Sequence, residues 1–157
     1  LLNAIIEYKN KIIFIKHNID YGNEELVAFM NKINIESYNN IKIYKHIDID
    51  KFSVLLKNCD CLIGNSSAGI REACVYGTPV INLGTRQQYR IDKKLKNVTT
   101  FLEFDKINII KKLNEYKNHR FKPNLVFGDG NASKKIVEIL KKINYKNNSK
   151  VLSYIKN

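Results

Sequence analysis

The residues best suited to chemistry lie in one short stretch, Gly64–Gly69 (GNSSAG). The apolar run Cys61–Ile63 before it predicts a buried strand, and Ile70–Tyr76 after it predicts a helix. A helix that begins at a strand exit has main-chain N–H groups without partners, and two serine hydroxyls stand beside them. Together these groups suit a phosphate. A second interpretation stays open, in which Ser66 or Ser67 only caps the helix. The two are compatible, because one serine can cap while the other binds.

Two charged residues extend this candidate anion site. Glu72 lies one turn into the predicted helix, where a carboxylate can accept two hydrogen bonds from a ribose diol. Arg86 follows the next predicted strand, and its fork of donors can pair with a diphosphate. Each has an ordinary alternative: a solvated helix position for Glu72 and a surface ion pair for Arg86. Neither residue is decisive singly.

Other reactive side chains are arranged less informatively. The three histidines, at positions 17, 46 and 119, have no metal-ligand spacing. Cys59-x-Cys61 lacks the second pair that a zinc site needs. Cys61 and Cys74 are typical of packing residues. No Ser-His-Asp or Cys-His arrangement emerges, so we expect no metal site and no nucleophilic triad in this chain.

The pattern along the chain predicts the elements that position these residues. The expected strands are Lys11–Lys16, Ile41–His46, Cys61–Ile63, Pro79–Leu83 and Asn97–Phe101. The expected helices are Glu24–Ile33, Asp50–Asn58 with Asp50 as N-cap, Ile70–Tyr76 ended by Gly77, Asp105–Tyr116 and Ala132–Ile143. Strands that alternate with helices indicate an open parallel α/β sheet of the Rossmann-like kind. Ligands of such sheets bind beyond the carboxyl ends of the strands. Three loops fall there: His17–Asn23, Gly64–Gly69 and Gly84–Arg90.

Length and composition limit the alternatives. The 157 residues suffice for one Rossmann-like domain over 1–143, followed by a polar tail over 144–157. The net charge of +12 suggests nucleic acid at first. However, 23 of the 27 basic residues are lysine, in a chain also rich in Ile and Asn, so a codon bias accounts for much of the excess. We therefore expect neither a nucleic-acid nor a membrane partner. Three cysteines and no signal peptide favour the cytoplasm.

One longer stretch of the sequence points to a particular protein family. Ile63–Arg86 (IGNSSAGIREACVYGTPVINLGTR) resembles the nucleotide-binding signature of the UDP-N-acetylglucosamine 2-epimerases. It is most similar to the hydrolysing branch, which makes N-acetylmannosamine for sialic-acid-type sugars. The flanking matches lie in family order: Asn18-Ile19-Asp20 with Gly22, Lys45-His46-Ile47, and Phe127–Ala132. One departure is His17, where a proline is common.

The resemblance implies a glycosyltransferase-B-type enzyme of two Rossmann-like domains, of which this chain is the C-terminal, UDP-binding one. Carried over, Ser66 and Ser67 would contact the diphosphate, Glu72 the ribose hydroxyls, and Arg86 the UDP end of the substrate. Asn18 would line the cleft, and the main chain at His46 and Ile47 would meet uracil.

The family reaction is anti elimination of UDP, which leaves 2-acetamidoglucal, and then addition of water to give the 2-epimer. The carboxylates that move protons come mainly from the N-terminal domain, so we expect no catalytic residue in this chain and no cofactor. The resemblance implies UDP-N-acetylglucosamine or UDP, the N-terminal domain and a homo-oligomer as partners. Two alternatives stay open: half of a glycosyltransferase of the same architecture, and a stand-alone UDP-sugar-binding domain.

Overall fold

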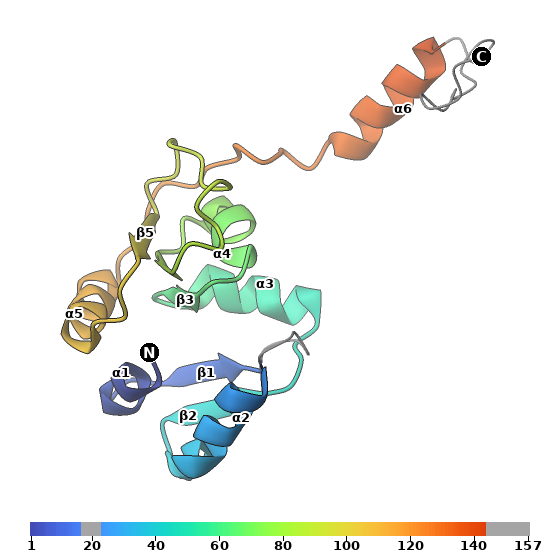
Figure 1. Ribbon diagram of the computed structural model, residues 1–157. Coiled ribbons are helices and arrows are strands. Elements are labelled where there is room, and N and C mark those ends of the chain that lie inside the picture. Colours follow the sequence, from blue (N-terminus) through green and yellow to red (C-terminus); the bar gives the residue numbers. More distant parts are fainter. Residues whose placement is uncertain (17–22, 144–157) are drawn as a thin grey trace, which may run out of the picture. The chain divides into compact units, whose positions relative to one another are not determined.

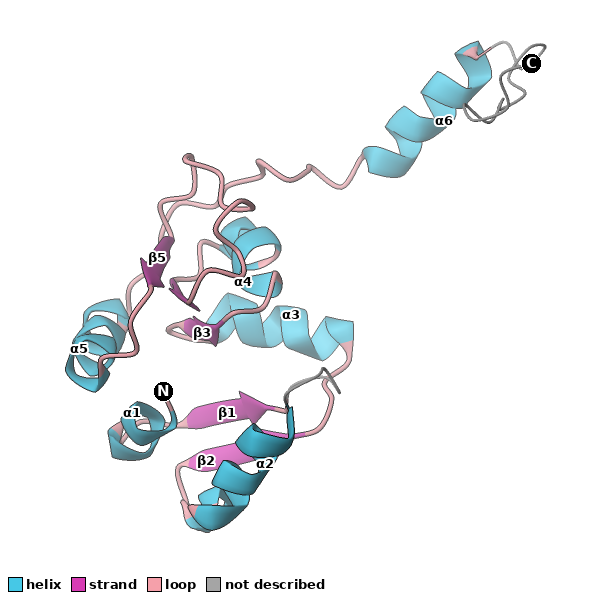
Figure 2. Cartoon of the chain, in the orientation of Figure 1, coloured by secondary structure: helices cyan, strands magenta, loops and turns pink. Residues whose placement is uncertain are grey.

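Strands and helices alternate in the computed structural model, which describes residues 1–16 and 23–143 (Figure 1). All five predicted strands are present: β1 (Ile12–Ile15), β2 (Ile41–Tyr44), β3 (Leu62–Gly64), β4 (Val80–Leu83) and β5 (Val98–Phe101). Every pairing between them is parallel. Figure 2 shows helices in the connections from β1 to β2, β2 to β3 and β3 to β4. The α/β class with parallel strands is therefore confirmed.

The five strands are divided between two sheets. β1 pairs with β2, and the larger sheet has the order β3-β4-β5. Its register aligns Gly64 with Asn82 and Asn82 with Thr100, so the three strands end at one edge. A cavity of about 380 Å³, lined mostly by apolar side chains, has residues of both β1 and β3 in its wall, among them Ile13 and Ile63. The parallel arrangement thus matches the expectation, while the sheet is not continuous across β1 and β3.

Helices line the connections and cover the strands. They are α1 (Leu2–Glu7), α2 (Asn23–Lys32), α3 (Ile49–Asn58), α4 (Ala68–Arg71), α5 (Lys106–Tyr116) and α6 (Ala132–Lys142), with 3-10 turns η1 (Ile35–Ser37) and η2 (Ala73–Tyr76). α1 and η1 are too short to give a periodic signal and were not predicted. The helix predicted over 70–76 is divided between α4 and η2, and Gly77 ends it as expected, with a φ of +64°. No helix in the described ranges is long and apolar enough to span a membrane.

β4 is the centre of the core. All four of its residues are buried. Ile81 and Leu83 cluster with Ile109 of α5, whereas Val80 clusters with Leu56 of α3. Successive strand residues point to opposite faces, so this division shows that helices cover both faces of the larger sheet. Each such side chain contributes about 1.5–3 kcal/mol on burial, and the rigid strand holds the loop that follows it.

Aspartates stand at two of the helix starts, and one of them differs from the prediction. Asp105 caps α5, because its carboxylate accepts the N–H groups of Ile107 and Asn108, each at 3.2 Å. Asp50 is not an N-cap: α3 begins at Ile49, and Asp48 holds the cap position. Two aspartates two residues apart offer the same local signal. Asp50 lies in the first turn, where its charge still complements the helix dipole.

The chain divides into two compact units, Leu1–Asn124 and Leu125–Asn157. In the second unit, Asp129 accepts the N–H of Asn131 at 3.0 Å and pairs with Lys135 at 3.1 Å. These bonds lower the pKa of Asp129 to about 2. No residue of α6 is buried. The expected tail 144–157 lies outside the described residues, so the boundary at residue 143 stays a prediction.

Candidate functional site

The exit of β3 is shaped by a glycine. Gly64 leaves the strand with a φ of +151°, a conformation that L side chains rarely adopt. The chain then turns through Asn65, Ser66 and Ser67 into α4. Ser66 is exposed and Ser67 half-buried, so both lie within reach of a ligand. The strand–loop–helix unit expected around the serines is therefore present.

The two serines use their hydroxyls differently. Ser66 Oγ accepts the N–H of Ala68 at 3.3 Å, so Ser66 stabilises the turn. Ser67 holds the N-cap position, but its side chain makes no cap hydrogen bond. Among the described residues, the main-chain N–H groups of Ser66 and Ser67 have no hydrogen-bond partner. One hydroxyl and two N–H groups are thus free to donate to an anion, alongside one serine that stabilises the turn.

Glu72 stands at the end of α4, where its N–H bonds the carbonyl of Ala68 at 3.1 Å. Its side chain is exposed and enters no ion pair within the described ranges. Since α4 has only four residues, little helix dipole acts on the loop, and the individual N–H groups carry the donor capacity. A free carboxylate one turn from the serines can accept from a diol.

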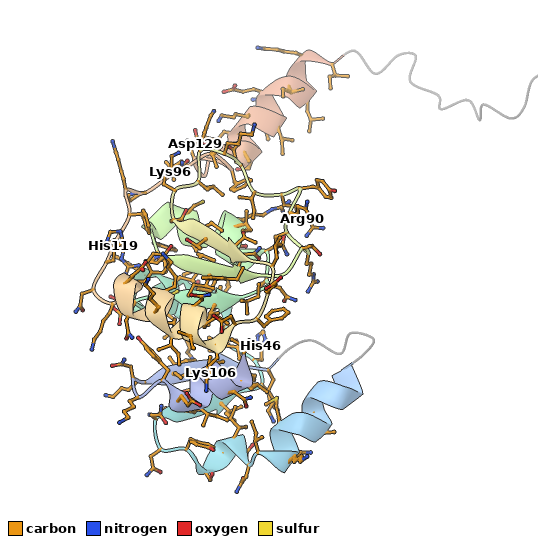
Figure 3. All side chains as sticks on the ribbon, turned by 60° about the vertical axis from the view of Figure 1, so that its left-hand side comes forward. His46, Arg90, Lys96, Lys106, His119 and Asp129 are labelled. Atoms are coloured by element: carbon orange, nitrogen blue, oxygen red, sulfur yellow. The ribbon has the colours of Figure 1, made fainter. Side chains whose placement is uncertain are left out.

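The exit of β4 brings Arg86 to the same edge of the sheet. Gly84 still bonds β5, with its N–H donating to the carbonyl of Phe101 at 2.8 Å. Arg86 follows two residues later, is exposed, and pairs with no acid in the described part of the chain. Figure 3 shows Arg90 farther along the same loop. Ser66, Ser67 and Arg86 therefore belong to loops that follow adjacent parallel strands, and Glu72 lies at the end of the helix that follows the serines.

A residue absent from the sequence predictions joins these two loops. Gln87 is only 1% exposed, and its Nε2 donates to the main-chain carbonyl of Asn65 at 2.8 Å. Its Oε1 is buried without a partner among the described residues. The one available signal was its place directly after Arg86. Nothing local in the sequence shows that this amide, unlike its neighbours, points inward.

The predicted uracil contacts lie at the exit of a strand in the other sheet. His46 and Ile47 follow β2, in the smaller sheet, and Figure 3 shows His46 there. His46 Nε2 lies 3.8 Å from Asp48 Oδ1, and both side chains are largely exposed. Within the described residues, no hydrogen bond or ion pair joins His46 to the β3 or β4 exit. Asn18 lies outside the described residues.

The cysteines are packing groups. All three are free thiols. Burial raises the pKa of Cys61 to about 12 and also raises the pKa values of Cys59 and Cys74. Since the thiolate is the nucleophile and the metal ligand, these thiols are poor at both tasks near neutral pH. No group of three His, Cys, Asp or Glu side chains that could hold a metal occurs in the described ranges.

Solved structures with a similar fold indicate the class of protein to which this chain belongs. Solved structures of a UDP-GlcNAc 2-epimerase from Methanocaldococcus jannaschii match 89% of this chain at 24% identity, with TM-scores of 0.65 and 0.68, and are covered over 40% and 38% of their length. The second is described as a complex with UDP-GlcNAc and UDP. The chain is thus a Rossmann-like α/β domain of the glycosyltransferase-B type. The family model "UDP-N-acetylglucosamine 2-epimerase" matches residues 1–141. The chain belongs to the UDP-N-acetylglucosamine 2-epimerase family.

Two curated relatives of this chain are also named as 2-epimerases of UDP-sugars. A UDP-N-acetylglucosamine 2-epimerase of Neisseria meningitidis is 42% identical over 79 residues, which are 50% of this chain and 20% of the relative. A hydrolysing UDP-N,N'-diacetylbacillosamine 2-epimerase of Legionella pneumophila is 29% identical over 144 residues, 91% of this chain and 37% of the relative. The chain spans well under half the length of both relatives.

Proposed function

We propose that this chain is the UDP-binding part of a hydrolysing UDP-N-acetylglucosamine 2-epimerase, which releases UDP and N-acetylmannosamine. The observation that carries the proposal is that a hydrogen bond joins the loop after β3 to the loop after β4. Free donors of Ser66 and Ser67 follow β3, Arg86 follows β4, and the Gln87–Asn65 hydrogen bond holds the two loops together. Family membership supplies the nucleotide sugar as the ligand.

Each residue has a defined part in this proposal. The N–H groups of Ser66 and Ser67 and the Ser67 hydroxyl donate to the diphosphate, with Arg86 pairing its charge. Glu72 accepts both hydroxyls of the ribose. These groups stabilise the negative charge of the departing UDP, so they favour elimination without moving a proton.

The uridine end is assigned to the β2 exit. There the main chain of His46 and Ile47 would bond the edge of uracil, and Asn18 would line the cleft. Support for this part comes from the sequence resemblance and from the position of β2 as a parallel strand, because ligands of parallel sheets bind beyond the carboxyl ends of the strands.

The proton-transferring groups belong, in this proposal, to an N-terminal domain of the same enzyme, in the cytoplasm. A homo-oligomer is the second expected partner.

The enzyme that contains this chain should convert UDP-N-acetylglucosamine to UDP and N-acetylmannosamine without any acceptor. Proton NMR of the reaction would follow both products. A UDP-N-acetylmannosamine product would assign the non-hydrolysing branch instead. Sugar transfer only in the presence of an acceptor would assign a glycosyltransferase.

A further inference from the structure

Gln87 is the buried residue in the otherwise exposed run from Thr85 to Arg90. Its neighbours Arg86 and Gln88 are exposed, and Tyr89 is 94% exposed, whereas Gln87 is 1% exposed. The side chain turns inward and its Nε2 reaches the carbonyl oxygen of Asn65, 22 residues earlier. The bond therefore joins the loop after β4 to the loop after β3.

This bond fixes a direction as well as a position. The peptide unit between Asn65 and Ser66 is planar and trans, so its C=O and N–H point to opposite sides. Because Gln87 holds the Asn65 carbonyl inward, the N–H of Ser66 is turned away from Gln87. That N–H has no partner in the described part of the chain.

The other end of the amide shows that Gln87 does more than fill space. Its Oε1 is buried and unpartnered within the described residues, a cost that a methionine or leucine of similar size would not carry. Burial of this amide is therefore unfavourable at Oε1, and the hydrogen bond of its Nε2 is what offsets that cost.

We infer that Gln87 is a positioning residue, which aims the Ser66 N–H at the diphosphate and touches no ligand itself. The inference rests on the proposed UDP-binding function. Gln87 also fixes the backbone next to Arg86, so one buried side chain aligns donors on both loops. The consequence is selective: losing the bond should weaken the binding of phosphates and leave the binding of the nucleoside unchanged.

The test compares Gln87→Met and Gln87→Glu with Gln88→Met and Gln88→Glu in the full chain. NMR titrations with UDP and with uridine would give dissociation constants for each. We expect both Gln87 variants to lose about tenfold in UDP affinity and less than twofold in uridine affinity. The Gln88 variants, altered one residue away on an exposed side chain, should match the unaltered chain.

The unaltered chain provides a measurement that needs no variant. UDP should shift the amide resonance of Ser66, and uridine should not. If UDP leaves the Ser66 amide resonance unshifted, or if the Gln87 variants lose equal affinity for UDP and for uridine, the positioning role is wrong. The proposed UDP binding would not be affected by either result. Failure of the unaltered chain to bind UDP would overturn the proposed function, and this inference with it.

Discussion

Gly69 faces Val80 across the helix–sheet interface with no room for a side chain. A Cβ added to Gly69 would lie only 2.9 Å from Val80 Cγ1. The same Cβ would lie 3.6 Å from Leu62 Cδ2. α4 therefore rests directly on β3 and β4, at a spacing that a glycine permits. Since α4 carries the serine loop at its start, this contact sets the height of the anion-binding donors above the sheet.

Gly69→Ala should destabilise the chain by about 1–3 kcal/mol, because the added methyl group overpacks the interface. Val80→Ala removes the atom it would strike. In a double-mutant cycle, Gly69→Ala should therefore cost less in the Val80→Ala background than in the unaltered chain, as measured by urea unfolding. Equal costs in both backgrounds would show that the contact does not determine the spacing.

Glu72→Ala should weaken UDP binding more than pyrophosphate binding, because only UDP offers a ribose diol. Calorimetry with both ligands would check this. Glu36→Ala is the matched control, since it removes the same charge from an exposed position on η1. If pyrophosphate binding weakens as much as UDP binding, Glu72 holds the helix in place and its ribose role is wrong.

Asp105→Ala should lower the free energy of unfolding by about 1 kcal/mol, because the N–H groups of Ile107 and Asn108 lose their acceptor. Asp105→Asn should retain most of that stability. Asp50→Ala is the control, an exposed aspartate in the first turn of α3 that does not cap. Chemical denaturation that gave equal losses for Asp105→Ala and Asp50→Ala would refute the capping role.

Cys61 should make the chain sensitive to alkali. Burial raises its pKa from 9.0 to about 12 in the folded chain, so the folded state favours the neutral thiol. Its contribution to stability is complete below about pH 9 and is lost as the pH rises toward 12. The stability advantage of the unaltered chain over Cys61→Ala should therefore shrink between pH 8 and pH 11. A constant difference in urea midpoints would contradict this.

The sequence predicted what depends on local pattern. Apolar runs bounded by Gly, Pro and Asp located all five strands, and Gly77 marked a helix end correctly. Pairing is not local, so nothing in the runs themselves showed that β1 and β3 would lie in different sheets. The same limit hid Gln87: its burial depends on a carbonyl 22 residues away. Asp50 failed for a subtler reason, because Asp48 carries an identical signal two residues earlier.

The central claim is that the β3 and β4 exits bind the phosphates of UDP. Calorimetry of the full chain with UDP and with uridine tests it most directly. We predict a dissociation constant for UDP on the order of 0.1–1 mM, or about 4–5.5 kcal/mol, because one domain supplies only part of a closed cleft. Uridine should bind at least about tenfold more weakly, since it offers nothing to Ser66, Ser67 or Arg86. Equal affinities for the two ligands would contradict the account.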